Sequence, residues 1–199
     1  KDATGIGTAT GYYAGTNSYS NQAIANFNTN DTSYNDFGVA AHNTGQCFRA
    51  TATGEVPSVS FKLSKTGTLS GNLTLNIITG ANIQGTNGTD QMPIASPTPA
   101  STTTFDAVGL GLTGTATDTT LTLSSPYSIT SGTDYCIWLI YNGSGAINIE
   151  QSASAHTNDN YFNCTVITNC GTNTIDYTYQ INVLSATGTL ESISFTAPS

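Results

Sequence analysis

The four cysteines are the residues of this 199-residue chain with the clearest covalent chemistry. They are Cys47, Cys136, Cys164 and Cys170, and four cysteines allow three pairings. No Cys-x-x-Cys pair is present, so the spacing does not favour a zinc site. Cys164 and Cys170 flank a five-residue turn-like segment and could close a small loop, whereas Cys47 and Cys136 each lie in an apolar strand pattern and could join two strands. Free buried thiols are the alternative.

Side chains suited to catalysis are few. His42 and His156 are the only histidines, and Ser144 lies in an Asn-Gly-Ser-Gly turn rather than in the Gly-x-Ser-x-Gly elbow of a nucleophilic serine. The twelve acidic residues include no pair that stands out as the two opposed carboxylates of a glycoside hydrolase. We therefore expect no enzyme and no catalytic residue, and a hydrolase that uses Glu150 or Asp159 is a distant alternative.

Runs of Asn and Asp could hold a calcium ion. The candidate ligands are Asp31, Asp36 and Asp159, each of which follows an asparagine directly. Ca²⁺ prefers oxygen ligands from loops. Asn and Asp also form turns by hydrogen bonding to their own backbone, which is the simpler explanation. Calcium is thus the one cofactor that the pattern allows, and none is required.

Tyrosines near the N-terminus are candidates for contacting a glycan. Tyr12, Tyr13, Tyr19 and Tyr34 are interleaved with asparagines, and exposed aromatic faces beside amides suit sugar binding. The competing interpretation, which we prefer, is that these tyrosines pack an N-terminal arm onto the body or onto a neighbouring subunit.

Five Asn-x-Ser/Thr sequons are candidate N-glycosylation sites. Thr and Ser make up 56 of the 199 residues, so the 19 asparagines produce about five sequons by chance. The number of sequons therefore carries no information. Their asparagines are Asn30, Asn72, Asn87, Asn142 and Asn163.

The charge and the hydropathy exclude several classes of protein. Only 8% of the residues are charged, against about 25% in an ordinary soluble domain, and the net charge is −8. A protein that binds nucleic acid or anionic lipid through phosphate contacts needs the opposite sign of charge. No apolar run reaches the roughly 18 residues of a membrane span. Paired cysteines and few lysines indicate an extracellular location, on a cell or particle surface.

Period-two alternation dominates the chain and predicts an all-β protein. Examples are Val59, Phe61 and Leu63, and the alternation over 175–183, with Gly and Asn between the runs. Eight to ten such strands without helices predict an antiparallel two-sheet β-sandwich. A jelly-roll topology is our first choice and an immunoglobulin-like arrangement the second. We expect an N-terminal arm over residues 1–45, a sandwich domain over 46–199, and a long surface loop over 84–104.

The chain from Gln46 onward also resembles a known group of modules. It is similar to the jelly-roll β-sandwich modules of secreted bacterial, archaeal and phage surface proteins, which include carbohydrate-binding-like and anchoring domains. The resemblance implies a jelly roll and a role in adhesion, filament building or glycan binding, and it supplies no catalytic motif. The composition also resembles that of secreted archaeal filament subunits. The motifs that carry the resemblance are Gln46-x-Phe48-x-Ala50, Val56-x-x-Val59-x-Phe61-x-Leu63-x-Lys65-x-Gly67, Gly71-x-Leu73-x-Leu75-x-Ile77 and Tyr127-x-Ile129-x-x-Gly132-Thr133-x-Tyr135-x-Ile137.

One predicted strand, residues 135–141, is apolar on both faces. Its second face carries Cys136, Trp138 and Ile140, and each large side chain left in water would forfeit roughly 1.5–3 kcal/mol. We expect a second cover, either from loop 84–104, from the N-terminal arm or from another subunit. A neighbour's residues 3–10 could add a strand there, with Ile6 as an apolar plug. The leading interpretation is a structural subunit of an extracellular filament or virion-like assembly whose partners are copies of itself. A glycan-binding adhesive module is the alternative.

Overall fold

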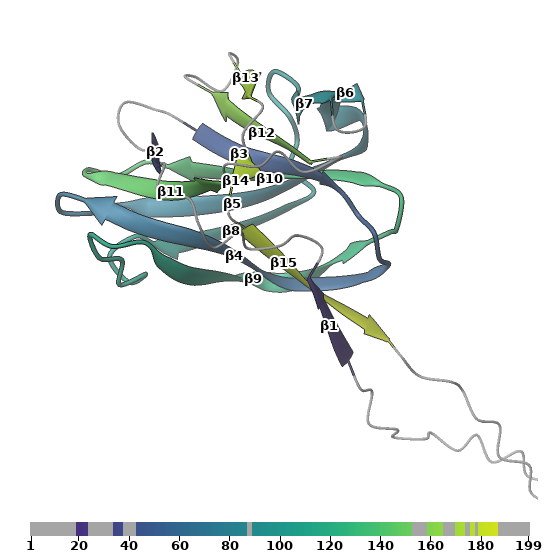
Figure 1. Ribbon diagram of the computed structural model, residues 1–199, viewed down its shortest axis with the longest axis horizontal. Helices are drawn as coiled ribbons and strands as arrows, with labels where there is room; N and C mark the ends of the chain where they lie inside the picture. The colour runs from purple at the N-terminus through teal and green to yellow at the C-terminus, as the bar shows by residue number, and fades with distance from the viewer. Residues whose placement is uncertain are drawn as a thin grey trace, which may run out of the picture.

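The protein is built from antiparallel β-strands alone, apart from one short 3₁₀ turn in the part of the chain that the structure describes. The computed structural model describes residues 19–23, 34–37, 43–86, 89–152, 159–164, 170–173, 176–177 and 179–186. Side chains are described over 43–85 and 91–151 and at five later core positions. Two sheets pack face to face, which confirms the predicted β-sandwich (Figure 1).

Eight of the strands form a jelly roll. Taken in chain order, these eight strands alternate between the two sheets. The one exception is β5 and β8, which follow one another in this set and are neighbours in the same sheet. This order confirms the predicted jelly roll, which consists of eight strands in two sheets. The first sheet has the order β2 (Tyr34–Phe37), β11 (Ala146–Ser152), β4 (Gly54–Thr66) and β9 (Thr117–Ile129). The second sheet has the order β3 (Asn43–Arg49), β10 (Asp134–Tyr141), β5 (Asn72–Thr79) and β8 (Ser101–Asp106).

The described residues contain fifteen strands rather than eight to ten, because further strands extend both sheets. The first sheet gains β1 (Tyr19–Ala23), β14 (Asp176–Tyr177) and β15 (Tyr179–Ala186). The second gains β12 (Asp159–Cys164) and β13 (Cys170–Asn173) beyond β3. The remaining two, β6 (Ile83–Thr86) and β7 (Thr89–Pro93), form a separate hairpin that follows the 3₁₀ turn Gly80–Asn82.

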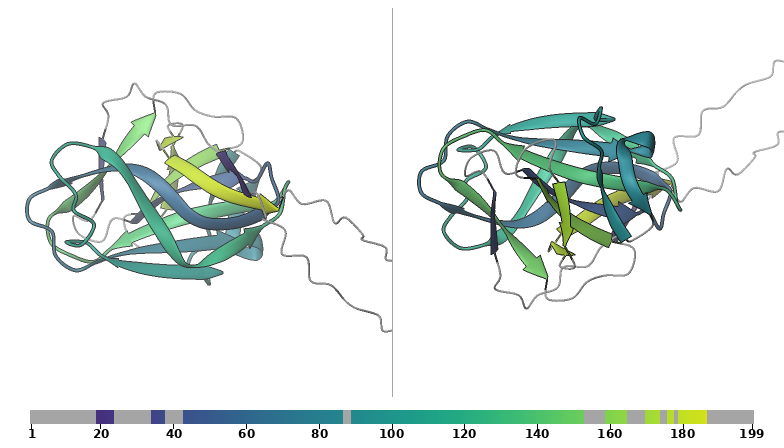
Figure 2. Two further views of the ribbon diagram at one scale, coloured as in Figure 1. Left: turned by 90° about the horizontal axis from the view of Figure 1, so that it is seen from below. Right: turned by 90° about the horizontal axis from the view of Figure 1, so that it is seen from above.

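The alternation over 175–183 predicts one strand, and the structure divides it between β14 and β15. β14 pairs with the end of β11, whereas β15 pairs with β4. This division follows from the length of β4, whose 13 residues pair on one edge with β9 and on the other with two strands in succession (Figure 2). β15 occupies the first half of that edge and β11 the second half.

The main core lies between the two sheets. Its side chains come from alternate positions of every jelly-roll strand whose side chains are described, apart from β8, which contributes the half-buried Phe105 at its margin. Phe61 of β4 stacks on Tyr179 at 6.1 Å between ring centroids, and Phe48 of β3 stacks on Tyr135 at 5.8 Å. The core therefore holds together the first strands of the jelly roll and the late strand β15.

Two predicted segment boundaries differ from the structure. Residues 84–104 are not one long loop, because they contain most of the β6–β7 hairpin and the start of β8. The apolar Ile83 and Met92 pack this hairpin against the rest of the chain, which a solvated loop would not do. The predicted boundary between residues 45 and 46 falls inside β3, and β2 before it belongs to the jelly roll.

Candidate functional site

The outward face of the second sheet is covered by a second, smaller core. Trp138 is only 3% exposed there, and Ile140 is half-buried. Ile83 and Met92 of the β6–β7 hairpin and Phe162 of β12 contribute to the cover. The prediction that this face of β10 needs a second cover is therefore confirmed, and the chain itself provides the cover. The burial of Trp138 thus gives no support to docking of another subunit at this place.

Gly45 allows Phe162 to lie across β3. The register places Gly45 directly between Trp138 of β10 and Phe162 of β12. A Cβ atom added to Gly45 would lie 2.0 Å from the carbonyl oxygen of Ile137 and 2.5 Å from Cζ of Phe162. Only glycine permits this approach, so the aromatic ring fills the space above a residue that has no side chain.

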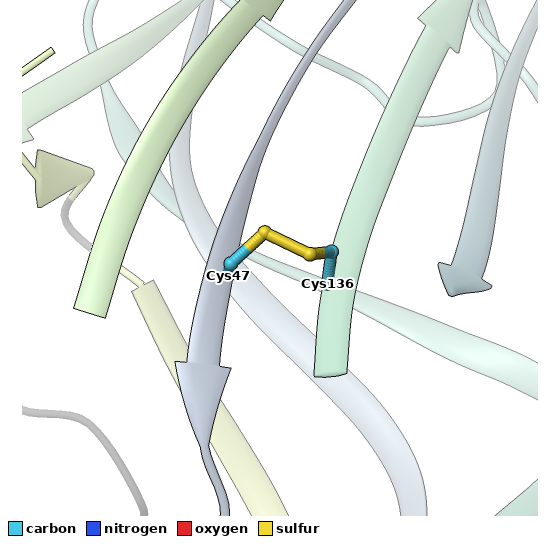
Figure 3. The surroundings of a disulfide bond; sticks show 2 residues. All are labelled: Cys47 and Cys136. Atoms are coloured by element: carbon cyan, nitrogen blue, oxygen red, sulfur yellow. A yellow bond between two sulfur atoms is a disulfide. The ribbon is translucent and has the colours of Figure 1, made fainter. Parts of the chain in front are cut away.

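A disulfide joins the two central strands of the same face. Cys47 of β3 and Cys136 of β10 are directly opposite in the register and are bonded to each other (Figure 3). This confirms the predicted link between two strands. Cys164 and Cys170 are opposite each other in the β12–β13 register. Their side chains lie outside the described part of the structure, so the second disulfide stays a prediction.

A groove of about 430 Å³ opens where β3 ends and β10 begins. Arg49 and Asp134 face each other across these two strand ends, two residues beyond the disulfide and on the same face of the sheet. Arg49 Nη1 donates to both carboxylate oxygens of Asp134, at 3.2 and 3.4 Å. The two side chains are 38% and 27% exposed, so the ion pair is accessible at the groove. The lining residues are Arg49, Gly80, Ile83, Gly85, Gln91, Gly132, Thr133 and Asp134.

The wall of the groove at the turn between β9 and β10 is held by backbone hydrogen bonds. Ala50 N–H donates to the carbonyl of Thr133 at 2.9 Å, and Gly132 N–H donates to the carbonyl of Ala50 at 2.7 Å. Gly132 has a φ of +80°, a conformation that glycine adopts without strain. The turn is therefore fixed to the end of β3 rather than held by its own two strands alone.

Two tyrosines support this end of the sandwich from inside. The hydroxyl of Tyr135 accepts a hydrogen bond from the N–H of Thr130 at 3.0 Å. Tyr127 packs edge-on against Tyr135 with 6.2 Å between the ring centroids. Burial, followed by the nearby Tyr135 phenol, raises the pKa of Tyr127 above its ordinary value. Tyr127 therefore stays neutral to a higher pH than a free tyrosine.

The carboxylate considered for a hydrolase is held in the other sheet. Glu150 Oε1 accepts from Lys62 Nζ at 3.2 Å, which places the glutamate in an ion pair. Among the residues with described positions, no group of three or more His, Cys, Asp or Glu side chains is close enough to hold a metal. Of the calcium candidates, Asp36 lies in β2 and Asp159 begins β12, and their side chains are outside the description, as is all of Asp31.

Of the candidate tyrosines, only the backbones of Tyr19 and Tyr34 lie in the described part of the chain. Tyr19 begins β1 and Tyr34 begins β2, and these strands pair with different partners, β15 and β11. Their side chains are not described, and Tyr12, Tyr13 and Ile6 lie wholly outside the described residues.

Two of the sequons lie at one end of the sandwich. Asn72 and Asn142 are exposed neighbours there, because Asn142 Oδ1 accepts from the N–H of Asn72 at 2.8 Å. Asn163 lies in β12 with its side chain outside the description, and Asn30 and Asn87 are outside the described residues.

The groove residues were missed by the sequence reasoning. One signal was available, because Arg49 is the only arginine in the chain and one of just four basic residues. A lone guanidinium beside a carboxylate can make bidentate contacts that a lysine cannot. The partner Asp134 could not be identified from sequence, since it is 85 residues away.

Both sheets end in an open edge on the same side of the sandwich. β9 pairs only with β4, and β8 only with β5, among the strands that the structure describes. The two edges meet where the N–H of Ser124 donates to Oγ1 of Thr103 at 3.0 Å. β9 is the longer edge, with 13 residues.

Comparison with known proteins finds no match for this chain. No protein-family model, curated protein or solved structure matches it. The strand order agrees with the fold that the resemblance to surface modules implies, and a fold alone does not imply a function. In the described part of the chain, no helix is long and apolar enough to cross a membrane.

Proposed function

We propose that the protein is the structural subunit of an extracellular filament or surface assembly, built by main-chain pairing along the open edge of β9. The observation that carries this proposal is that β9 has no charged residue from 119 to 129 and is a long edge strand. Soluble proteins usually protect such edges with lysines, prolines or short strands, because an open edge can pair with another chain. β9 contains no lysine; its only proline is Pro126 and its only charged residue is Asp118.

The occupant of this edge in the proposal is an N-terminal segment of a neighbouring copy. Two β9 edges that pair with each other give a closed dimer, because the same surface is used twice. A filament requires two different surfaces, and residues 3–10 are small and carry a single large aliphatic residue, Ile6. Pairing of this segment with β9 would satisfy its open main-chain groups, as in strand addition, except at Ser124, whose N–H already donates to Thr103.

The extracellular location is part of the same proposal. The Cys47–Cys136 disulfide is typical of proteins in oxidising environments.

The proposal is tested by placing a charge on the edge. Thr122 is exposed on β9, and Thr122→Lys should leave the fold intact and reduce assembly at low salt. Thr68→Lys, in the exposed turn between β4 and β5, adds the same charge away from either edge and should assemble like the unmodified protein. Light scattering and electron microscopy measure the size and shape of the assemblies.

A second variant tests the N-terminal segment separately from the β9 edge. Deletion of residues 1–12 should abolish filaments and leave monomers or closed dimers. If the unmodified protein remains monomeric at high micromolar concentration, or if Thr122→Lys and the deletion both assemble normally, the proposal is wrong.

Glycan binding is the second candidate function. It is favoured by the Arg49–Asp134 groove rather than by the N-terminal tyrosines.

A further inference from the structure

We propose that the groove at the ends of β3 and β10 binds a neutral saccharide through the paired side chains of Arg49 and Asp134. This site is separate from the β9 edge, so the inference does not depend on the assembly proposal. It names a place and a ligand class for the glycan-binding alternative.

The ion pair offers both kinds of hydrogen-bonding group that a sugar needs. A guanidinium carries only donors and a carboxylate only acceptors, and here they lie 3.2 Å apart at the groove. Neighbouring hydroxyls of a sugar each donate and accept, so a pair of adjacent hydroxyls can bind to both groups at once. Hydrogen bonds to charged groups are stronger than those between neutral groups.

The charge of the groove selects against ionic ligands. Among the lining residues whose side chains the structure describes, Arg49 and Asp134 are the only charged ones, and their charges cancel. An anionic ligand would meet the carboxylate of Asp134 and the net charge of −8 on the whole chain. A cationic ligand would meet the only arginine. A neutral polar ligand avoids both costs.

The rest of the lining suits a polar ring with an apolar face. Ile83 supplies one apolar side chain, and Gln91, which is only 1% exposed, forms a buried part of the wall. Cβ atoms added to Gly80 and Gly132 would meet nothing within 4 Å, so these residues leave open space for a ligand beside the main chain.

The groove is also fixed in shape before any ligand binds. The β9–β10 turn is bonded to Ala50, and the disulfide two residues away joins the strands that carry the ion pair. On the other wall, Ile94 N–H donates to the carbonyl of Asn82 at 2.9 Å, which closes the base of the β6–β7 hairpin. A site that is already ordered loses less conformational freedom on binding.

The test is a titration of the full chain, followed by amide chemical shifts, with maltotriose, cellotriose and chitotriose as probes. At least one of them should shift the amides of Gly80, Gly132 and Thr133. Asp134→Asn keeps the size of the side chain and removes its charge, and it should weaken binding by roughly 10-fold or more, as expected for loss of a charged hydrogen bond. Thr133→Trp fills the groove and should abolish the shifts.

The matched control breaks the other ion pair. Glu150→Gln removes the partner of Lys62 in the first sheet and should bind the same probe with unchanged affinity. Glucuronic acid should bind more weakly than glucose, a neutral sugar of the same size. The inference is overturned if none of the three sugars shifts the groove amides, if the acid binds more tightly, or if Asp134→Asn and Thr133→Trp both bind normally.

Discussion

Substitution of Gly45 by alanine tests the packing of the second core most directly. The added Cβ would lie 2.0 Å from the carbonyl oxygen of Ile137, which belongs to the backbone of the adjacent strand. A flexible side chain could turn away, but a main-chain oxygen in the middle of a sheet cannot. β3 and β10 would therefore have to separate, or Phe162 would have to leave its position.

The expected loss in the free energy of unfolding lies at or above the upper end of the usual range for overpacking, about 3 kcal/mol. For a chain of this length, about 3 kcal/mol corresponds to a fall of roughly 6–12 °C in the melting temperature. Gly114→Ala is the matched control, because nothing lies within 4 Å of its added Cβ. Its effect should be neutral or stabilising by up to about 1 kcal/mol, since alanine restricts the unfolded chain.

Urea unfolding and thermal melts of both variants measure these differences. If Gly45→Ala fails to fold, it is compared in the Phe162→Ala background. There the cost of Gly45→Ala should be smaller but not zero, because the contact with the Ile137 carbonyl remains. A Gly45→Ala protein as stable as the Gly114→Ala protein would refute the close approach of β10 and β12 to β3.

Three further outcomes follow from single contacts. Cys47→Ser with Cys136→Ser opens a link across 89 residues, and the loss of stability should approach about 4–5 kcal/mol, measured by urea unfolding at constant pH. Tyr141→Phe removes a hydroxyl that donates to the main chain of the β4–β5 turn at 2.8 Å, and it should cost about 1–3 kcal/mol in the same assay. Tyr127 should ionise above its ordinary pKa of 10.0 in an ultraviolet titration of the folded protein, because burial and the neighbouring Tyr135 both favour the neutral phenol. The neutral phenol contributes its full stabilisation below pH 10, and this contribution is lost as the pH rises through the higher pKa of the folded protein. An ordinary or lowered pKa of Tyr127 in the folded protein would contradict this prediction.

Alternation of apolar residues was sufficient to predict the strands that build the main core. Val59, Phe61 and Leu63 face the core in β4, and Ile147 and Ile149 face it in β11, as their period of two requires. The same pattern could not show that the alternation over 175–183 is split between β14 and β15. Pairing partners are chosen by long-range contacts, and each half of that segment alternates in the same way.

The sequence by itself determined the fold class and the need to cover both faces of β10, and it left the Cys47–Cys136 disulfide as one of three possible pairings. The first two follow from local periodicity and from the cost of leaving Trp138 in water. Only the tertiary structure decided what covers Trp138, since a hairpin of this chain and a neighbouring subunit would bury it equally well. Only the structure brought Arg49 to Asp134, because the strand register alone sets which residues lie opposite each other.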